Sequence, residues 1–104
     1  MAYEPFEILN IDGEAPLLLI CDHASNYIPT ELNNLGLNRK KLKQHIAWDI
    51  GAANLTRKLS KIMDAAAILC STSRLIVDSN RTPEDGSGIT EISDGVIIPG
   101  NLNL

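Results

Sequence analysis

The sequence is poor in aromatic residues and lacks any long apolar segment. One Trp, one Phe and two Tyr make up only 4% of its 104 residues, so the core has to be aliphatic. The longest apolar run, APLLLIC at 15–21, is far shorter than the roughly 20 residues of a membrane-spanning helix. The first ten residues, MAYEPFEILN, contain an acidic residue and a proline where a signal peptide has a basic segment. We therefore expect a cytoplasmic protein with no membrane partner.

Basic residues and cysteines are also scarce. Nine Lys and Arg stand against 13 Asp and Glu, which gives a net charge of -4. Nucleic-acid-binding domains usually carry a basic face, so a nucleic-acid partner is not expected. Cys21 and Cys70 each end an apolar run, a position that favours buried free thiols over a disulfide in a cytosolic protein.

The length and composition bound the domain organisation. A chain of 104 residues is at most one ordinary domain, and 44% hydrophobic with 21% charged residues is typical of a globular one. Its last residues, IIPGNLNL, contain the end of an apolar run and then a Pro-Gly turn. They show no pattern of a closing helix. We expect residues 1–104 to form a single, incomplete domain.

Hydrophobic patterning predicts an α/β fold. The continuous apolar run at 16–21 is typical of a strand that is covered on both faces. Apolar residues at helical spacing, from Trp48 to Met63, predict a helix over 49–64. In chain order we expect a strand at 16–21, a helical turn at 29–36, a helix capped by Asn38, the helix at 49–64, strands at 65–70 and 73–78, a loop at 79–95 and a short strand at 95–100. This order indicates a layered domain with short crossovers.

His23 is the first candidate for chemistry. It follows the strand at 16–21 by two residues, where open α/β sheets place their ligands, and neutral imidazole binds zinc well. The alternative is a hydrogen-bonded structural His, which is the more common case for a lone His after a strand. Asp49 becomes a second metal ligand if His23 faces it, and otherwise suits the start of a helix as its N-cap. Asn26 is a rival second ligand, although a neutral amide binds zinc less well than a carboxylate.

A second candidate site lies in SRLIVDSNR. In an extended segment, alternation places Arg74 and Asp78 on one face, and Asn80 and Arg81 follow in the loop. Two arginines near one strand end suit a small anionic ligand, because a guanidinium binds a carboxylate bidentately. The alternative is that Asp78 pairs with Arg74 or Arg81 and braces the loop.

Four segments together resemble the N-terminal part of the N-formylglutamate amidohydrolase family. They are CDHASNYIP at 21–29, HIAWDIGAANLTRKL at 45–59, SRLIVDSNR at 73–81 and SDGVIIPGN at 93–101. The resemblance covers nearly all of the chain from about residue 16. That family is similar in fold to the zinc carboxypeptidases and acylase-like desuccinylases. The resemblance thus implies a mixed sheet flanked by helices, with one zinc at the strand ends.

The resemblance also implies a metal site. His23 matches the first zinc-binding His, and Asp49 stands where more distant amidohydrolases of the family carry an Asp ligand. Asn26 occupies the position of the second ligand, a Glu, in the carboxypeptidases. In the longer family members, the third zinc-binding His and an acidic general base lie in the C-terminal half. His45, inside a predicted helix, is not expected to replace that His.

The implied reaction is zinc-dependent hydrolysis of an N-acyl amino acid such as N-formyl-L-glutamate, which gives formate and glutamate. Arg74 resembles the Arg that polarises the scissile carbonyl, and Asn80 and Arg81 resemble the pair that holds a substrate carboxylate. Another N-acyl amino acid or a peptide is an alternative substrate. A second hypothesis is a non-catalytic domain or anion-binding module with an incomplete metal site. The sequence leaves a homo-oligomer open.

Overall fold

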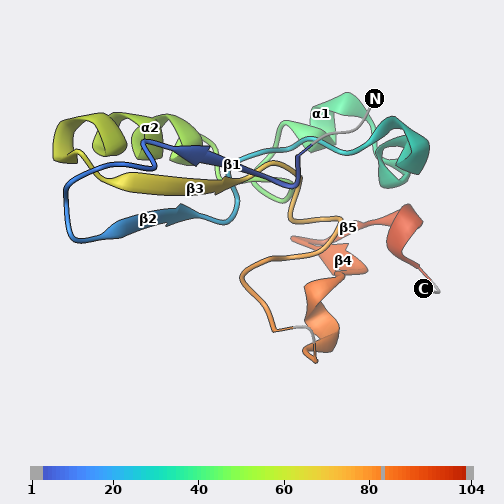
Figure 1. Ribbon diagram of the computed structural model, residues 1–104. Helices are drawn as coiled ribbons and strands as arrows, with labels where there is room; N and C mark the ends of the chain where they lie inside the picture. The colour runs from blue at the N-terminus through green and yellow to red at the C-terminus, as the bar shows by residue number, and fades with distance from the viewer. Residues whose placement is uncertain (1–3, 83, 103–104) are drawn as a thin grey trace.

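A computed structural model describes residues 4–82 and 84–102. Its central element is a three-stranded sheet in the order β1-β3-β2, in which β2 is parallel and β1 antiparallel to β3 (Figure 1). The strands are β1 (Phe6–Leu9), β2 (Leu18–Cys21) and β3 (Ala66–Cys70). The predicted α/β fold with a mixed sheet and the strands near 16–21 and 65–70 are confirmed. β1 was not predicted.

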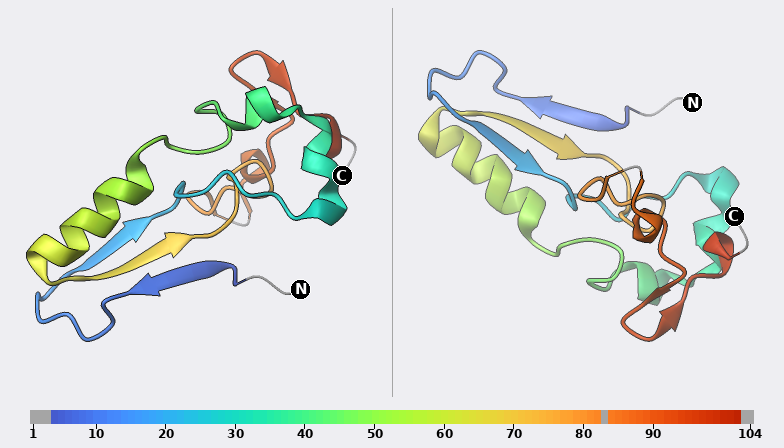
Figure 2. Two further views of the ribbon diagram at one scale, coloured as in Figure 1. Left: turned by 90° about the horizontal axis from the view of Figure 1, so that it is seen from above. Right: turned by 90° about the horizontal axis from the view of Figure 1, so that it is seen from below.

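Helix α2 (Ala52–Met63) packs along one face of this sheet (Figures 1 and 2). Gly51, with a φ of 86°, turns the chain into the helix, so Asp49 is not its N-cap. Small side chains, including Ala52 and Ala53, pack against the sheet. The predicted apolar stripe was wrong in part, because Leu55 and Ile62 are exposed. Small residues let the helix approach the sheet closely, and the bulkier ones then point away.

The expectation that the strand at 16–21 is covered on both faces was also wrong for the described residues. Leu19 and Cys21 lie on the face that α2 covers, whereas Leu18 and Ile20 on the opposite face are exposed. One helical layer therefore covers one face of this sheet.

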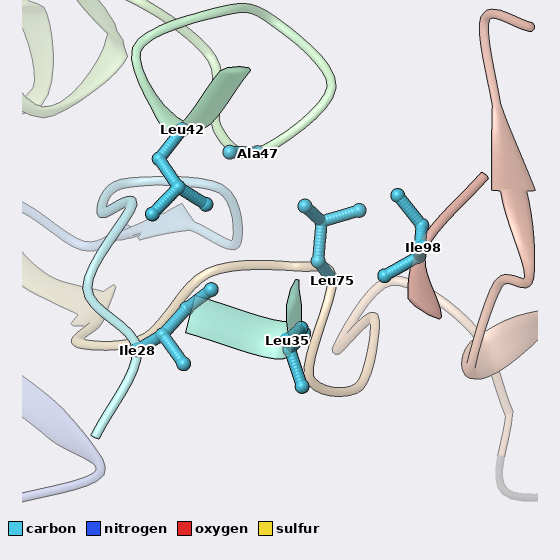
Figure 3. Close-up of a cluster of buried hydrophobic side chains, with 6 residues drawn as sticks. All are labelled: Ile28, Leu35, Leu42, Ala47, Leu75 and Ile98. Atoms are coloured by element: carbon cyan, nitrogen blue, oxygen red, sulfur yellow. The ribbon is translucent and has the colours of Figure 1, made fainter. Parts of the chain in front are cut away.

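A second core lies beyond the sheet. It consists of Ile28, Leu35, Leu42, Ala47, Leu75 and Ile98, which converge from separate segments in Figure 3. They come from the chain before and within the helical turn Thr30–Gly36, from α1 (Arg39–Leu42) and the turn after it, from the loop that carries Leu75, and from Ile98, which follows the hairpin of β4 (Ile92–Ser93) and β5 (Val96–Ile97). Two 3-10 turns lie at Gly86–Gly88 and Pro99–Asn101. In this core, aliphatic side chains bind short, irregular segments together.

Asn38 caps α1 as predicted, since its Oδ1 accepts a hydrogen bond from the Lys41 amide at 2.9 Å. The helix itself ends at Leu42, earlier than the sequence pattern indicated. Cys21 and Cys70 are free thiols, as expected, with Cys21 buried and Cys70 partly buried. None of the helices in the described ranges has the length and apolarity to cross a membrane.

Residues 73–78 form a turn, and the predicted strand there was wrong. The Ile76 amide donates to the Ser73 carbonyl at 3.1 Å, which closes the turn. The Ser73 hydroxyl donates to the Ala47 carbonyl at 2.7 Å and accepts from the Leu75 amide at 3.2 Å. These hydrogen bonds, of which the one to Ala47 is tertiary, replace the strand ladder, and Leu75 is fully buried whereas Val77 is exposed.

Gly13 allows the chain between β1 and β2 to lie against the end of α2. A Cβ atom at Gly13 would lie 2.7 Å from the Asp64 carbonyl oxygen and 2.9 Å from the Ala66 nitrogen, both backbone atoms. We expect Gly13→Ala to lower the free energy of unfolding by about 1–3 kcal/mol, as overpacking typically does. Gly86→Ala is the matched control, because a Cβ there meets nothing within 4 Å. Equal urea midpoints for the two variants would contradict the close approach at Gly13.

Candidate metal and anion site

His23 lies just past β2, between two carboxylates that come from different parts of the chain. Its Nε2 is 2.7 Å from Asp78 Oδ1, and its Nδ1 is 3.3 Å from Asp49 Oδ2. The side chains of His23 and Asp78 are about nine-tenths buried, whereas that of Asp49 is 54% exposed. A hydrogen bond of 2.9 Å from the Asp49 amide to the His23 carbonyl holds the two segments together.

The two distances distinguish two kinds of contact. A separation of 2.7 Å is a short hydrogen bond, in which Nε2 is the donor because the Asp78 carboxylate can only accept. The 3.3 Å gap at Nδ1 is long for a charge-assisted hydrogen bond. It is close to the separation of about 3.4 Å that ordinary Zn–N and Zn–O bond lengths give two ligands of a tetrahedral zinc. The pair is therefore spaced as metal ligands would be.

The electrostatics of the pair admit a proton or a metal ion. When only Nε2 carries a ring proton, Nδ1 and the Asp49 carboxylate present lone pairs to each other, and a cation between them satisfies both. A second ring proton or a metal ion meets that need. The nearest fixed cation, Arg74, is 3.8 Å from the other oxygen of Asp49 and bonds more closely to Asp78. The metal sites of other proteins often use such a carboxylate–histidine pair to fix the ligand's tautomer.

Asp78 holds the site together, although its sequence position suggested only a pair with Arg74 or Arg81 that braces the loop. Besides His23, its carboxylate accepts hydrogen bonds from Arg74 at 2.8 Å and from the Asn80 amide at 3.0 Å. The proposed Arg74–Asp78 pair is thus present. Burial tends to raise the pKa of Asp78, but the hydrogen bonds from His23, Asn80 and Arg74 outweigh it and lower the pKa overall. Asp78 lies in the same sequence segment as Arg74, and this position was the signal in the sequence that it could belong to the site.

The candidate anion-binding residues line two neighbouring pockets. Arg74, Asp78 and Arg81 line a pocket of about 290 Å³, whereas Asn80 lines one of about 280 Å³ together with His23 and Asp49. The predicted Asn-Arg pair is therefore divided: Asn80 lines the pocket of His23 and Asp49, and Arg81 lines the pocket of Arg74.

The two other candidates lie apart from His23. The amide of Asn26 donates to the Leu42 carbonyl at 2.8 Å, and so serves as a structural tie. His45 lies 3.2 Å from Asp94 in an exposed ion pair on the hairpin. Within residues 4–82 and 84–102, no group of three or more His, Cys, Asp or Glu side chains is arranged to hold a metal ion. His23 and Asp49 thus fit a zinc as two of the three protein ligands that a catalytic site needs.

The chain belongs to the N-formylglutamate amidohydrolase family, whose family model matches residues 15–103. It is also similar to a crystal structure of a gene product from Agrobacterium tumefaciens, with 38% sequence identity and a TM-score of 0.94. The match covers 97% of this chain and 40% of that one. No curated protein matches the chain.

Proposed function

We propose that this chain provides part of a metal-dependent amidohydrolase site that acts on N-formyl-L-glutamate or a closely similar N-acyl amino acid. The single observation that carries the proposal is the spacing of His23 Nδ1 and Asp49 Oδ2, which suits two ligands of one zinc. Family membership supports amide hydrolysis as the reaction class. Zinc, the identity of the substrate and the roles of the residues are part of the proposal.

In this mechanism His23 and Asp49 hold the metal together with a further ligand. When bound, the metal supplies a water of lowered pKa, near 7 in known zinc hydrolases. Asp78 keeps the His23 ring proton on Nε2 and so keeps Nδ1 free to bind. Arg74, 3.8 Å from Asp49, lies close enough to stabilise negative charge that develops on the formyl oxygen.

Asn80 and Arg81 hold a substrate carboxylate in the proposed complex. The Arg81 guanidinium lines the 290 Å³ pocket next to Arg74, and it can bind a carboxylate bidentately. Asn80 lines the pocket on the His23 side of Asp78 and can fix the amide end of the substrate near the metal. Formate and glutamate are the products.

An anion-binding module without catalysis is the second candidate function. Two metal ligands within the described residues, rather than three, favour it for the 104-residue chain. The two arginines and their pocket are sufficient to bind a small dicarboxylate without any metal.

Zinc titration by calorimetry tests the metal assignment. We expect one zinc per chain, with the affinity at least about tenfold lower in His23→Ala and in Asp49→Asn, because each change removes one ligand. His45→Ala is the matched control and should bind as the wild type does, since the exposed His45 pairs with Asp94 and not with His23 or Asp49. If His45→Ala alone abolished binding, the metal assignment would be wrong.

Ligand titration followed by NMR tests the anion site. We expect Arg81→Lys to weaken binding of N-formyl-L-glutamate about tenfold, because Lys cannot form the bidentate contact. Arg39→Lys, on α1, should have no effect. Formate release, measured in parallel, separates the two candidate functions: binding without formate release favours the binding module. If the amino acid were released from another N-acyl amino acid and not from N-formyl-L-glutamate, the proposed substrate would be wrong.

A further inference from the structure

The pocket that contains Arg74 and Arg81 is lined by two segments that are separate in the sequence. Its lining residues within 74–81, which include both arginines, are called the arginine wall, and those within 87–94 are called the loop wall. In the described part of the chain, no strand ladder joins the two walls. Other contacts therefore have to set the width of the pocket.

The buried side chain of Asn101 connects the two walls. Its Nδ2 donates hydrogen bonds to the Leu75 carbonyl at 2.7 Å and to the Thr90 carbonyl at 2.8 Å. Leu75 belongs to the arginine wall and directly follows Arg74, whereas Thr90 belongs to the loop wall. Asn101 is only 3% exposed, so water competes little for these bonds. One amide group thus holds a point on each wall.

Asn101 is itself held in place by its own turn. Its backbone amide donates to the Ile98 carbonyl at 3.0 Å, at the end of the 3-10 turn Pro99–Asn101. Ile98 is fully buried in the second core, beside Leu75 in Figure 3. Gly100 packs so closely on Leu35 that a Cβ atom there would lie 2.7 Å from the Leu35 Cα. The connection between the walls therefore starts from a fixed point.

The chemistry of this connection requires an amide side chain. Two carbonyls need two N–H donors from one group, and a primary amide supplies two, a hydroxyl one and a carboxylate none. A second bond between the walls, from the Asp78 amide to the Gly88 carbonyl at 2.7 Å, is made by backbone atoms alone. A substitution can therefore remove the Asn101 connection, and the Asp78 amide can report whether the walls then separate.

We propose that Asn101 is a positioning residue for the anion pocket. It fixes the distance between the arginine wall and the loop wall, and so keeps the pocket narrow around the guanidiniums. A wider pocket admits water beside Arg74 and Arg81, and water weakens their attraction for a carboxylate. The inference rests on the proposed function for the nature of the ligand. It adds a residue from SDGVIIPGN, a segment to which the proposed mechanism gives no role.

Ligand titration combined with urea unfolding tests the proposal. In Asn101→Ala we expect the Kd of N-formyl-L-glutamate, measured by NMR on the folded chain, to rise at least about tenfold, as loss of positioning can cause. Asn26→Ala is the matched control, because the Asn26 amide also donates to a backbone carbonyl, that of Leu42 at 2.8 Å. Both variants should lower the urea midpoint, but Asn26→Ala should change the Kd by less than about twofold. A lower midpoint with an unchanged Kd in Asn101→Ala overturns the proposal, and so does an equal rise in both variants.

Hydrogen exchange at the Asp78 amide tests the same connection without any ligand. This amide bonds across the two walls, so it should exchange at least about tenfold faster in Asn101→Ala and at the wild-type rate in Asn26→Ala. An unchanged rate in Asn101→Ala overturns the proposal. A wild-type chain that does not bind N-formyl-L-glutamate rejects the proposed anion site alone, because the exchange rates still show whether Asn101 holds the walls together.

Asn101→Gln is the second variant, for the case in which Asn101→Ala does not fold. Gln keeps both donors but places them one methylene further from the backbone, so the two carbonyls keep their partners while the width of the pocket changes. We expect a folded chain whose Kd for N-formyl-L-glutamate is at least about threefold higher. A Kd equal to that of the wild type contradicts the proposed role.

Discussion

Asp78→Ala is expected to lower the free energy of unfolding by about 2–4 kcal/mol. The substitution removes a buried acceptor that His23, Arg74 and the Asn80 amide share. His23 Nε2 then has no acceptor in a site shielded from water, whereas Arg74 is partly exposed and recovers some hydration. Urea unfolding followed by circular dichroism gives the change directly.

Asp94→Asn is the control for this prediction, because Asn tolerates the left-handed backbone of Asp94, whose φ is 49°. Asp94 also pairs with a His, but both side chains are 69% exposed. Such surface pairs contribute about 0–1 kcal/mol, so we expect little change. Equal losses in the two variants would show that Asp78 is no more than a surface brace.

Asp78 also predicts how stability depends on pH. Its pKa is lowered in the folded state, so the carboxylate stabilises the fold above its ordinary pKa of about 3.9, and this contribution is lost as the pH falls through the folded value. Asp78→Asn lacks the titrating group. We therefore expect the difference in unfolding free energy between wild type and Asp78→Asn to shrink on acidification from pH 6 to below pH 4. A difference that stays constant over this range would contradict the assignment.

Leu75→Ala is expected to cost about 2–5 kcal/mol, the range for deletion of a fully buried Leu side chain. Leu75 is fully buried and lies centrally in the second core, between Leu35 and Ile98 in Figure 3. Truncation leaves a cavity, because the irregular segments around it are held by other contacts. The measurement is again the urea midpoint and slope.

Val77→Ala distinguishes the turn from a strand. In a strand, Leu75 and Val77 would share a face and would respond alike. In the turn, Val77 is 52% exposed, so its truncation should cost less than about 1 kcal/mol. Comparable losses at both positions would restore the strand that the sequence pattern indicated.

Local patterns predicted the parts of the fold that depend on neighbouring residues. The apolar runs located β2 and β3, and the side chain of Asn38 specified the start of α1. For the site, the motifs identified His23 and Asp49, which the structure places side by side. Their role as metal ligands remains a prediction.

The features that the sequence did not predict depend on distant partners. The turn at 73–78 is fixed by Ser73, whose hydroxyl bonds to Ala47. β1 is a strand because β3, some 60 residues later, supplies its hydrogen-bonding partner. Asp78 joins His23 across 55 positions of sequence. No window of neighbouring residues contains these contacts.

The pairing of β1 with β3 has a consequence for synthesis of the chain. Phe6 pairs with Cys70, so the strand made first waits for a partner made near the end of the sheet region. At 5–20 residues per second, a ribosome needs roughly 3–12 s to translate the intervening 60 or so residues. During that interval neither β1 nor β2 has a hydrogen-bonding partner, because each of them pairs with β3, and the sheet forms only after β3 has left the ribosome.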